Sequence, residues 1–396
     1  MKIKQAPDDF VVEELTDVAP STGPFALYRL DKVGWTTNDA LDVARRRWRI
    51  DTRRLSYGGL KDRHARTSQF LTILHGPRRN LAQQSFTVTY LGQVTSAYTS
   101  TSIRANRFGI TIRALSDEQV ESARRALAEL AADGLANYFD DQRFSSVASS
   151  GDFVARQLIL GNFEAALKLA LMAPYEHDRS AAKREKATLR KHWGGWAECK
   201  QKLSRGQAQS VVGYLASQPT DFRGAFAHVR ADLASLYMAA YQSHLWNRLL
   251  ACWLQQSLPA EQRISMRLRL DDFPTPRGLS GGQRAELAGL TLPLPSARLH
   301  YADEIADAPA NWSAVLRQVL EEEQIELSQM KLKGLRRPFF SRGDRPVMAL
   351  PQDMGCSSEV DDRHEGRQML QLGFVLPRGS YATLVVKRLV TSNEQL

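Results

Sequence analysis

The feature that most constrains the fold is a change in hydrophobic period along the chain, from about two residues to about 3.6 and back. Apolar and polar residues alternate over 86–91 and 108–113, as they do in half-buried strands. After Gly151 the spacing becomes helical, most clearly over 163–172 and 233–254. Strand-like segments return near the C-terminus, so we expect one α/β body interrupted by a mainly helical insertion.

Turn and capping residues bound the other expected elements. The expected strands are 8–15, 25–30, 70–74, 264–270, 346–350, 368–376 and 381–390, and the expected helices are 37–48, 117–132 and 311–323. This mixture predicts an α/β fold of the α+β kind, in which a mixed or antiparallel sheet forms the main body. Because 396 residues exceed one typical core, we also expect two domains.

The charge balance favours a polyanionic partner. The chain has 53 Lys and Arg against 43 Asp and Glu, a formal net charge of +10. Residues 45–54 hold six arginines and one aspartate, and residues 178–205 form a second basic cluster. Each phosphate that such residues neutralise releases condensed counterions, so two separate clusters fit one large anion contacted at two places. Solvated helix faces are the alternative interpretation.

Several classes of protein do not fit the sequence. No stretch approaches the roughly eighteen uninterrupted apolar residues of a membrane span. Residues 1–15 carry acids where a signal peptide has its apolar run, so we expect a cytoplasmic protein. Cys199, Cys252 and Cys356 are far apart, and the eight histidines lack the spacing of metal ligands. We therefore expect neither a disulfide framework nor a metal site.

One familiar motif is misleading. Residues 279–284 read Leu-Ser-Gly-Gly-Gln-Arg, the signature of ATP-binding-cassette proteins. That signature functions opposite a phosphate-binding loop of the G-x-x-x-x-G-K-S/T type, which this chain lacks. We therefore interpret the match as coincidence.

The segment 57–69 has the composition of a reactive loop. Gly58 and Gly59 allow a tight turn and the close approach of a ligand. Asp62 follows, flanked by Lys61 and Arg63. Cations beside a carboxylate favour its ionised form, which a nucleophile or a charge stabiliser requires. A surface turn with a salt-bridged aspartate is the alternative.

A second segment, 137–144, combines aromatic and polar side chains after a helix. A flipped-out base is held by aromatic stacking and by polar groups along its Watson–Crick edge. Asn137, Phe139, Gln142 and Arg143 could supply those contacts. A loop anchored in the core by its aromatic residues is the alternative.

An ordered set of short motifs runs through nearly the whole chain. They are Asp9-Phe10-x-Val12-x-Glu14, Gly59-Leu60-Lys61-Asp62-x-x-Ala65-x-Thr67-x-Gln69, Asn106-Arg107-Phe108, Asn137-Tyr138-Phe139-x-x-Gln142-Arg143-Phe144, Tyr241-Gln242-Ser243-x-Leu245-x-Asn247 and Leu376-Pro377-x-Gly379-Ser380-Tyr381-Ala382-Thr383. This set resembles the TruD family of tRNA pseudouridine synthases.

The resemblance implies a catalytic pseudouridine-synthase domain formed by 1–150 and 335–396, interrupted by an inserted domain at 151–334. A basic cleft between the two would bind tRNA, in which a uridine of the D-arm, at position 13, would become pseudouridine. The reaction needs no cofactor, because it involves neither redox change nor an external group. We also expect a monomer that binds no metal and no membrane.

The resemblance also assigns roles to individual residues. Asp62 would be the catalytic residue, acting on the sugar, on the base or through a glycal route. Phe139 would stack on the uracil, and Asn137 would shape the site beside it. The supporting residues for orientation and charge would be Lys61, Glu14 and Arg143.

Three positions depart from the family pattern. Ala105, Asp140 and Ser145 stand where family members usually have glycine. Their side chains would reshape the pocket for the base. They leave a second hypothesis from another class: a catalytically inactive protein that binds RNA or assists tRNA folding on the same scaffold.

Overall fold

The structure, a computed structural model, divides into two compact units. The first comprises Met1–Leu135 and Ala349–Leu396, and the second comprises Ala136–Met348. The predicted domain limits, 150/151 and 334/335, fall within the second unit and remain predictions. The described residues are all those of 1–396 except 176–177, 300–308, 310, 336–338 and 392–396.

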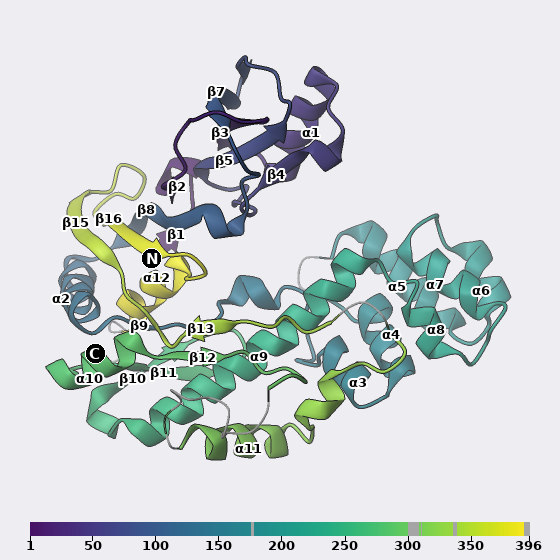
Figure 1. Cartoon of the computed structure of the whole chain (residues 1–396). Coiled ribbons are helices and arrows are strands. Elements are labelled where there is room, and N and C mark those ends of the chain that lie inside the picture. Colours follow the sequence, from purple (N-terminus) through teal and green to yellow (C-terminus); the bar gives the residue numbers. More distant parts are fainter. Residues whose placement is uncertain (176–177, 300–308, 310, 336–338, 392–396) are drawn as a thin grey trace. The chain divides into compact units, whose positions relative to one another are not determined.

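The first unit is built on a ten-stranded mixed sheet (Figure 1). Its strands are β1 (Lys2–Ile3), β2 (Phe10–Thr16), β3 (Phe25–Val33), β4 (Leu55–Tyr57), β5 (Arg66–Leu74), β6 (Leu81–Gln83), β7 (Phe86–Val94), β8 (Ile103–Leu115), β15 (Gln352–Val360) and β16 (Gln368–Pro377). The order is β15-β16-β8-β2-β5-β3-β7-β6, with β1 on β8 and β4 on β5. β2 and β5 are parallel, whereas β8 pairs antiparallel with β2 and β16. The predicted fold class is thus confirmed.

Helix α1 (Thr37–Trp48) covers part of this sheet. The Thr36 side chain caps its N-terminus by accepting a hydrogen bond from the Asp39 amide. Ala40, Leu41 and Ala44 are buried in one cluster with apolar residues of β3, β5 and β7. This packing holds α1 on the sheet, and the chain then continues from α1 through β4 into the loop between β4 and β5.

The C-terminal segment corrects one prediction. Residues 381–390 do not form a strand; α12 (Ala382–Thr391) is a helix that contacts α2 (Asp117–Asp133). The β-branched residues suggested a strand, but Leu384, Val385 and Leu389 are buried at spacings of one and four residues, which places them on one helical face. Arg388 is buried too and donates to Glu129 Oε2 on α2 at 2.6 Å. Tertiary packing therefore overrides strand propensity here.

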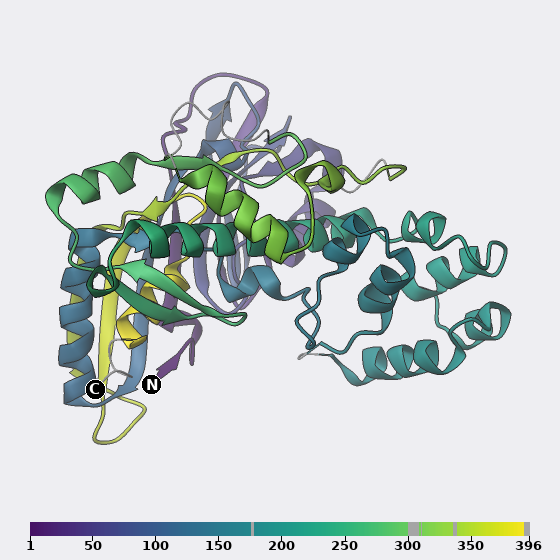
Figure 2. The ribbon, with the colours of Figure 1, turned by 90° about the horizontal axis from the view of Figure 1, so that it is seen from below.

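The second unit is mainly helical (Figures 1 and 2). Its helices are α3 (Val154–Ile159), α4 (Phe163–Met172), α5 (Ser180–His192), α6 (Trp196–Lys202), α7 (Gln207–Leu215), α8 (Phe222–Phe226), α9 (Ala231–Ser257), α10 (Gly281–Gly289) and α11 (Trp312–Glu322). Its short strands are β10 (Arg263–Arg267), β11 (Asp272–Pro276), β12 (Thr291–Pro293) and β13 (Asp344–Pro346), while β9 (Leu135–Ala136) and β14 (Met348–Ala349) lie at its limits. The predicted helices 163–172, 233–254 and 311–323 are confirmed.

Two local findings complete the fold. The segment 279–284 begins α10: the Ser280 hydroxyl accepts from the Gln283 amide, and the Gln283 side chain accepts from the Ser280 amide. This reciprocal capping box gives the sequence a structural role. Within the described ranges, no helix has both the length and the apolarity needed to cross a membrane.

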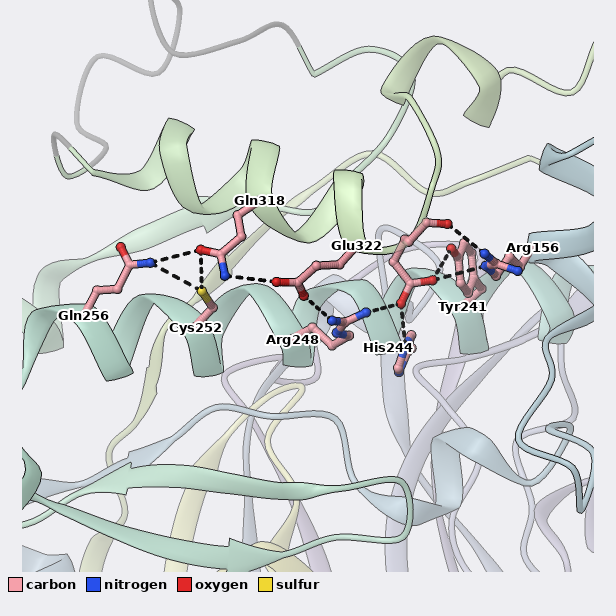
Figure 3. A network of polar contacts seen from close by, with 9 residues as sticks. Arg156, Tyr241, His244, Arg248, Cys252, Gln256, Gln318 and Glu322 are labelled. Atoms are coloured by element: carbon pink, nitrogen blue, oxygen red, sulfur yellow. Dashed lines mark hydrogen bonds and ion pairs between the residues drawn. The ribbon is translucent and has the colours of Figure 1, made fainter.

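A buried carboxylate joins three helices of the second unit (Figure 3). Glu323, which follows α11, accepts hydrogen bonds from Tyr241 at 2.8 Å and from Arg248, and it pairs with His244 at 3.1 Å. Arg156 of α3 lies 3.4 Å from the same carboxylate. Burial would raise the pKa of the Glu323 carboxyl, but hydrogen bonds from His244, Tyr241 and Arg248 lower it to about 2. This charge is therefore fully compensated.

Candidate active site

The loop between β4 and β5 presents Asp62 with its carboxylate partly open to solvent. Its side chain is 38% exposed, and Lys4 Nζ lies 2.5 Å from Asp62 Oδ2. The same ammonium group sits 4.0 Å from the ring centroid of Phe10, a cation–π distance. An accessible anion beside a cation suits both a nucleophile and a charge stabiliser.

A buried lysine, Lys32, binds the backbone of this loop. Lys32 Nζ donates to the carbonyl oxygens of Trp35 and Asp62, each at 2.8 Å, and of Lys61 at 3.4 Å. Burial lowers the pKa of Lys32 to about 8; Asp62 opposes that shift and Lys61 adds to it. The peptide that carries Asp62 is thus fixed by an ammonium group.

Gln69 of the motif and Thr37 of α1 tie the loop to the helix. Gln69 Nε2 donates to the Gly59 carbonyl at 3.0 Å, and the Thr37 hydroxyl donates to Gln69 Oε1 at 2.8 Å. The Lys61 amide in turn donates to the Thr37 hydroxyl at 3.0 Å. The glutamine of the G-L-K-D-x-x-A-x-T-x-Q motif therefore positions the loop that precedes Asp62.

Lys61 points to a buried acid rather than to solvent. Its Nζ lies 3.0 Å from Glu14 Oε2 and 2.5 Å from Asn106 Oδ1. Glu14 and Asn106 are opposite each other in the register of β2 and β8, which explains why one lysine reaches both. The Glu14 side chain is fully buried, and its Oε1 accepts from the Phe70 amide at 3.1 Å. The Lys61–Glu14 ion pair thus joins the loop that carries Asp62 to strand β2.

The second motif loop lies in the second unit and is held mainly by neutral groups. Asn247 of α9 accepts from the Phe139 amide at 2.7 Å and donates to the Phe139 carbonyl at 2.8 Å. Trp246 donates its indole N–H to the Asn137 carbonyl at 3.1 Å. The motifs at 137–144 and 241–247, distant in sequence, are therefore in direct contact.

Two arginines flank the ring of Phe139. The guanidinium carbon of Arg345 lies 4.0 Å from the ring centroid, and that of Arg143 lies 5.3 Å away. Arg345 also donates to Asn137 Oδ1 at 2.7 Å, while Arg143 donates to the Ser243 hydroxyl at 3.1 Å. Asn137 Nδ2 donates to the Pro346 carbonyl, so both ends of that amide are engaged within the protein.

The structure therefore places the predicted site residues in two groups. Asp62, Lys61 and Glu14 belong to the first unit, and the second unit contains Asn137, Phe139 and Arg143. The residues that contact them and that sequence reasoning missed include Lys4, Lys32, Asn247 and Arg345. Asn247 was detectable, because it closes a family motif. The other three are single basic residues without any local pattern.

Comparisons with known proteins agree with these motifs. The family model of tRNA pseudouridine synthase D (TruD) matches residues 1–266 and 287–389. A Methanococcus maripaludis protein named "Probable tRNA pseudouridine synthase D 1" is 28% identical over 396 residues, covering 98% of this chain and 99% of its own. A tRNA pseudouridine synthase D from Leptospira interrogans is 28% identical over 402 residues, covering 98% and 95%.

The fold agrees as well. A crystal structure described as tRNA pseudouridine synthase D from Methanosarcina mazei superimposes with a TM-score of 0.72 at 23% identity, covering 98% of this chain and 92% of that one. The matches define the class of protein: a pseudouridine synthase, which is an isomerase. The chain belongs to the TruD family of tRNA pseudouridine synthases, as its motifs predicted.

Proposed function

We propose that this enzyme converts a uridine in the D-arm of tRNA, at position 13, to pseudouridine, with Asp62 as the catalytic residue. One observation carries the assignment of Asp62. Its carboxylate is accessible and beside an ammonium group, whereas Asp9 and Glu14, the other acids of the motifs in the first unit, are buried and paired. An acid that touches substrate must be reachable, and a buried, paired acid is more costly to recruit.

The bond changes balance without an added reagent. The N1–C1′ bond of the uridine breaks, the uracil turns while it remains bound, and a C5–C1′ bond forms. C5 then loses its proton and N1 gains one, so atoms and electrons are conserved. Ionised Asp62 serves each of the routes considered, by adding to the sugar or the base or by assisting departure of the uracil.

Phe139 is the residue proposed to stack on the detached uracil, with Asn137 and Arg143 supporting it. Phe139 is 6% exposed, and the guanidinium carbons of Arg345 and Arg143 lie 4.0 and 5.3 Å from its ring centroid, so a base stacks on this ring only after a guanidinium group moves aside. Lys61 and Glu14 are proposed to support the Asp62 loop, because their ion pair joins that loop to strand β2.

The exposed cations of both units are proposed to bind the tRNA backbone. Arg46, Arg47 and Arg49 are exposed at the C-terminal end of α1, and Lys183 and Arg184 are exposed on α5. Contacts to phosphates make affinity fall with salt, so the logarithm of the association constant should decrease linearly with that of salt concentration. The basic cleft, the monomeric state and the cytoplasmic location expected from the sequence remain predictions.

The decisive experiment measures tritium release from tRNA labelled at uridine C5. Asp62→Asn should reduce the single-turnover rate by roughly 10⁴-fold, the scale for losing a nucleophile, while tRNA binding persists. The matched control is Asp31→Asn, because Asp31 also pairs with a cation and its side chain is 36% exposed. This control should retain the wild-type rate.

Two outcomes would contradict the proposal. Wild-type activity in Asp62→Asn would remove that residue from catalysis. Release that continues from a transcript with cytidine at position 13 would place the target elsewhere. If the wild-type protein binds tRNA in a salt-dependent way but releases no tritium, the inactive RNA-binding alternative is correct.

A further inference from the structure

The first unit contains a buried ammonium group that no carboxylate neutralises. Lys32 is 1% exposed. Among the described residues, no acid lies within ion-pair distance of its Nζ, and its three hydrogen bonds all go to backbone carbonyl oxygens. An ammonium group has three N–H donors, so this arrangement uses all of them. A charge kept in the interior at this cost calls for a reason beyond packing.

The positions of the three carbonyls give that reason. Lys32 is the penultimate residue of β3, where its register partners are Thr67 of β5 and Phe86 of β7. One carbonyl, of Trp35, belongs to the turn between β3 and α1. The other two, of Lys61 and Asp62, belong to the loop between β4 and β5. One side chain therefore ties the backbone of Asp62 to the rigid sheet.

We propose that Lys32 is a positioning residue for Asp62, fixing the Lys61–Asp62 segment so that the carboxylate keeps the direction required for catalysis. The inference rests on the proposed role of Asp62. The hydrogen bond of 2.8 Å from Lys32 to the Asp62 carbonyl restrains the backbone at Asp62. Misplacing a reacting group by about 1 Å costs roughly 100-fold in rate.

The charge state of Lys32 adds a readout that packing would not produce. Burial lowers its pKa to about 8, and the charged groups acting on it are Asp62, which raises the pKa, and Lys61, which lowers it. Below that pH the ammonium supplies three donors and a positive charge near Asp62. Above it, the neutral amine loses one donor and turns a lone pair toward a carbonyl oxygen. Positioning should therefore weaken on the alkaline side.

The test compares Lys32→Met with Lys32→Gln in the full-length protein. Methionine keeps an unbranched chain one atom shorter and removes every donor, whereas glutamine keeps N–H donors without the charge. We expect the single-turnover rate on saturating, C5-tritiated tRNA to fall about 100-fold in Lys32→Met and less in Lys32→Gln, with tRNA affinity within about two-fold of wild type. In the wild type, the rate should decline above pH 8; in Lys32→Met that decline should be absent.

Thr72→Val is the matched control for folding. Thr72 is equally buried, lies in β5 of the same sheet, and accepts a hydrogen bond from the Tyr98 amide at 2.8 Å. This variant should lose thermal stability and keep the wild-type rate per folded molecule.

The proposal is overturned if both Lys32 variants turn over at the wild-type rate, or if their loss only matches a loss of folded protein. If Lys32→Met does not fold, the Lys32→Gln rate and the wild-type pH profile decide in the same way. Wild-type activity in Lys32→Met beside an inactive Asp62→Asn refutes this inference alone. An active Asp62→Asn refutes the proposed function instead.

Discussion

Both units bury charged side chains, and two of these, Glu323 of the second unit and Lys32 of the first, are stabilised differently. Glu323 of the second unit is surrounded by charged and polar donors, and its pKa is lowered to about 2. Lys32 of the first unit donates its hydrogen bonds to backbone carbonyl oxygens, and burial lowers its pKa to about 8. For an acid a lowered pKa means a stabilised charge, whereas for a base it means a destabilised one.

The difference distinguishes a structural charge, Glu323, from a charge placed at the candidate active site, Lys32. The charge of Glu323 is compensated by ion pairs that cross three helices, so it joins those helices at all pH values near neutrality. The charge of Lys32 is incompletely compensated, so its pKa of about 8 is close to neutral pH and the charge is lost on mild alkalinisation. A charge of the second kind costs stability and is expected where its position serves function.

Glu323→Gln should give the largest effect on stability. The variant leaves Arg248 and Arg156 without their buried partner, and breaking such a pair costs about 3 to 5 kcal/mol. We expect the free energy of unfolding, measured with urea at pH 7, to fall by about 3 kcal/mol. The matched control is Glu322→Gln, because Glu322 also binds Arg248 but its side chain is 45% exposed. That control should lose less than about 1 kcal/mol.

The same variant has a defined pH dependence. The pKa of Glu323 is lowered from its ordinary value of 4.5 to about 2, so its contribution to stability is complete above pH 4.5. It is lost as the pH falls through that range toward 2. The stability difference between wild type and Glu323→Gln should therefore shrink to less than half of its value at pH 7 by about pH 3. A difference that grows on acidification would contradict the assignment.

Asn247→Leu tests whether the loop at 137–144 depends on neutral hydrogen bonds. The variant leaves the buried N–H and C=O of Phe139 without these partners, at about 1–3 kcal/mol each, so we expect a loss of at least about 2 kcal/mol. Because no charge is involved, the loss measured by urea unfolding should be equal at pH 6 and pH 9. Asn162→Leu, at an exposed position of the same unit, should change stability by less than about 0.5 kcal/mol.

The sequence predicts features that depend on neighbouring residues better than features that depend on contacts between segments far apart in the chain. Helices α1 and α2 follow from local caps and spacing, as does the exposed Asp62 loop from its two glycines and flanking cations. The helix at 382–391 was missed, because its β-branched residues favour a strand and only packing against α2 decides otherwise. Lys32 and Arg345 were missed for the same reason: a lone basic residue shows its role only once the fold brings a distant loop to it.

Lys4→Gln should have the smallest effect on stability and rate. It tests most directly whether Lys32, rather than Lys4, orients Asp62. The side chains of Lys4 and Asp62 are 20% and 38% exposed, and pairs open to solvent contribute less than about 1 kcal/mol. We expect unfolding to change by no more than that, and the single-turnover rate to fall only a few-fold, with the difference shrinking as salt screens the pair. Lys2→Gln, two residues away on the exposed β1, serves as the control. A 100-fold loss in Lys4→Gln would mean that a partly exposed cation, rather than the buried ammonium of Lys32, orients Asp62.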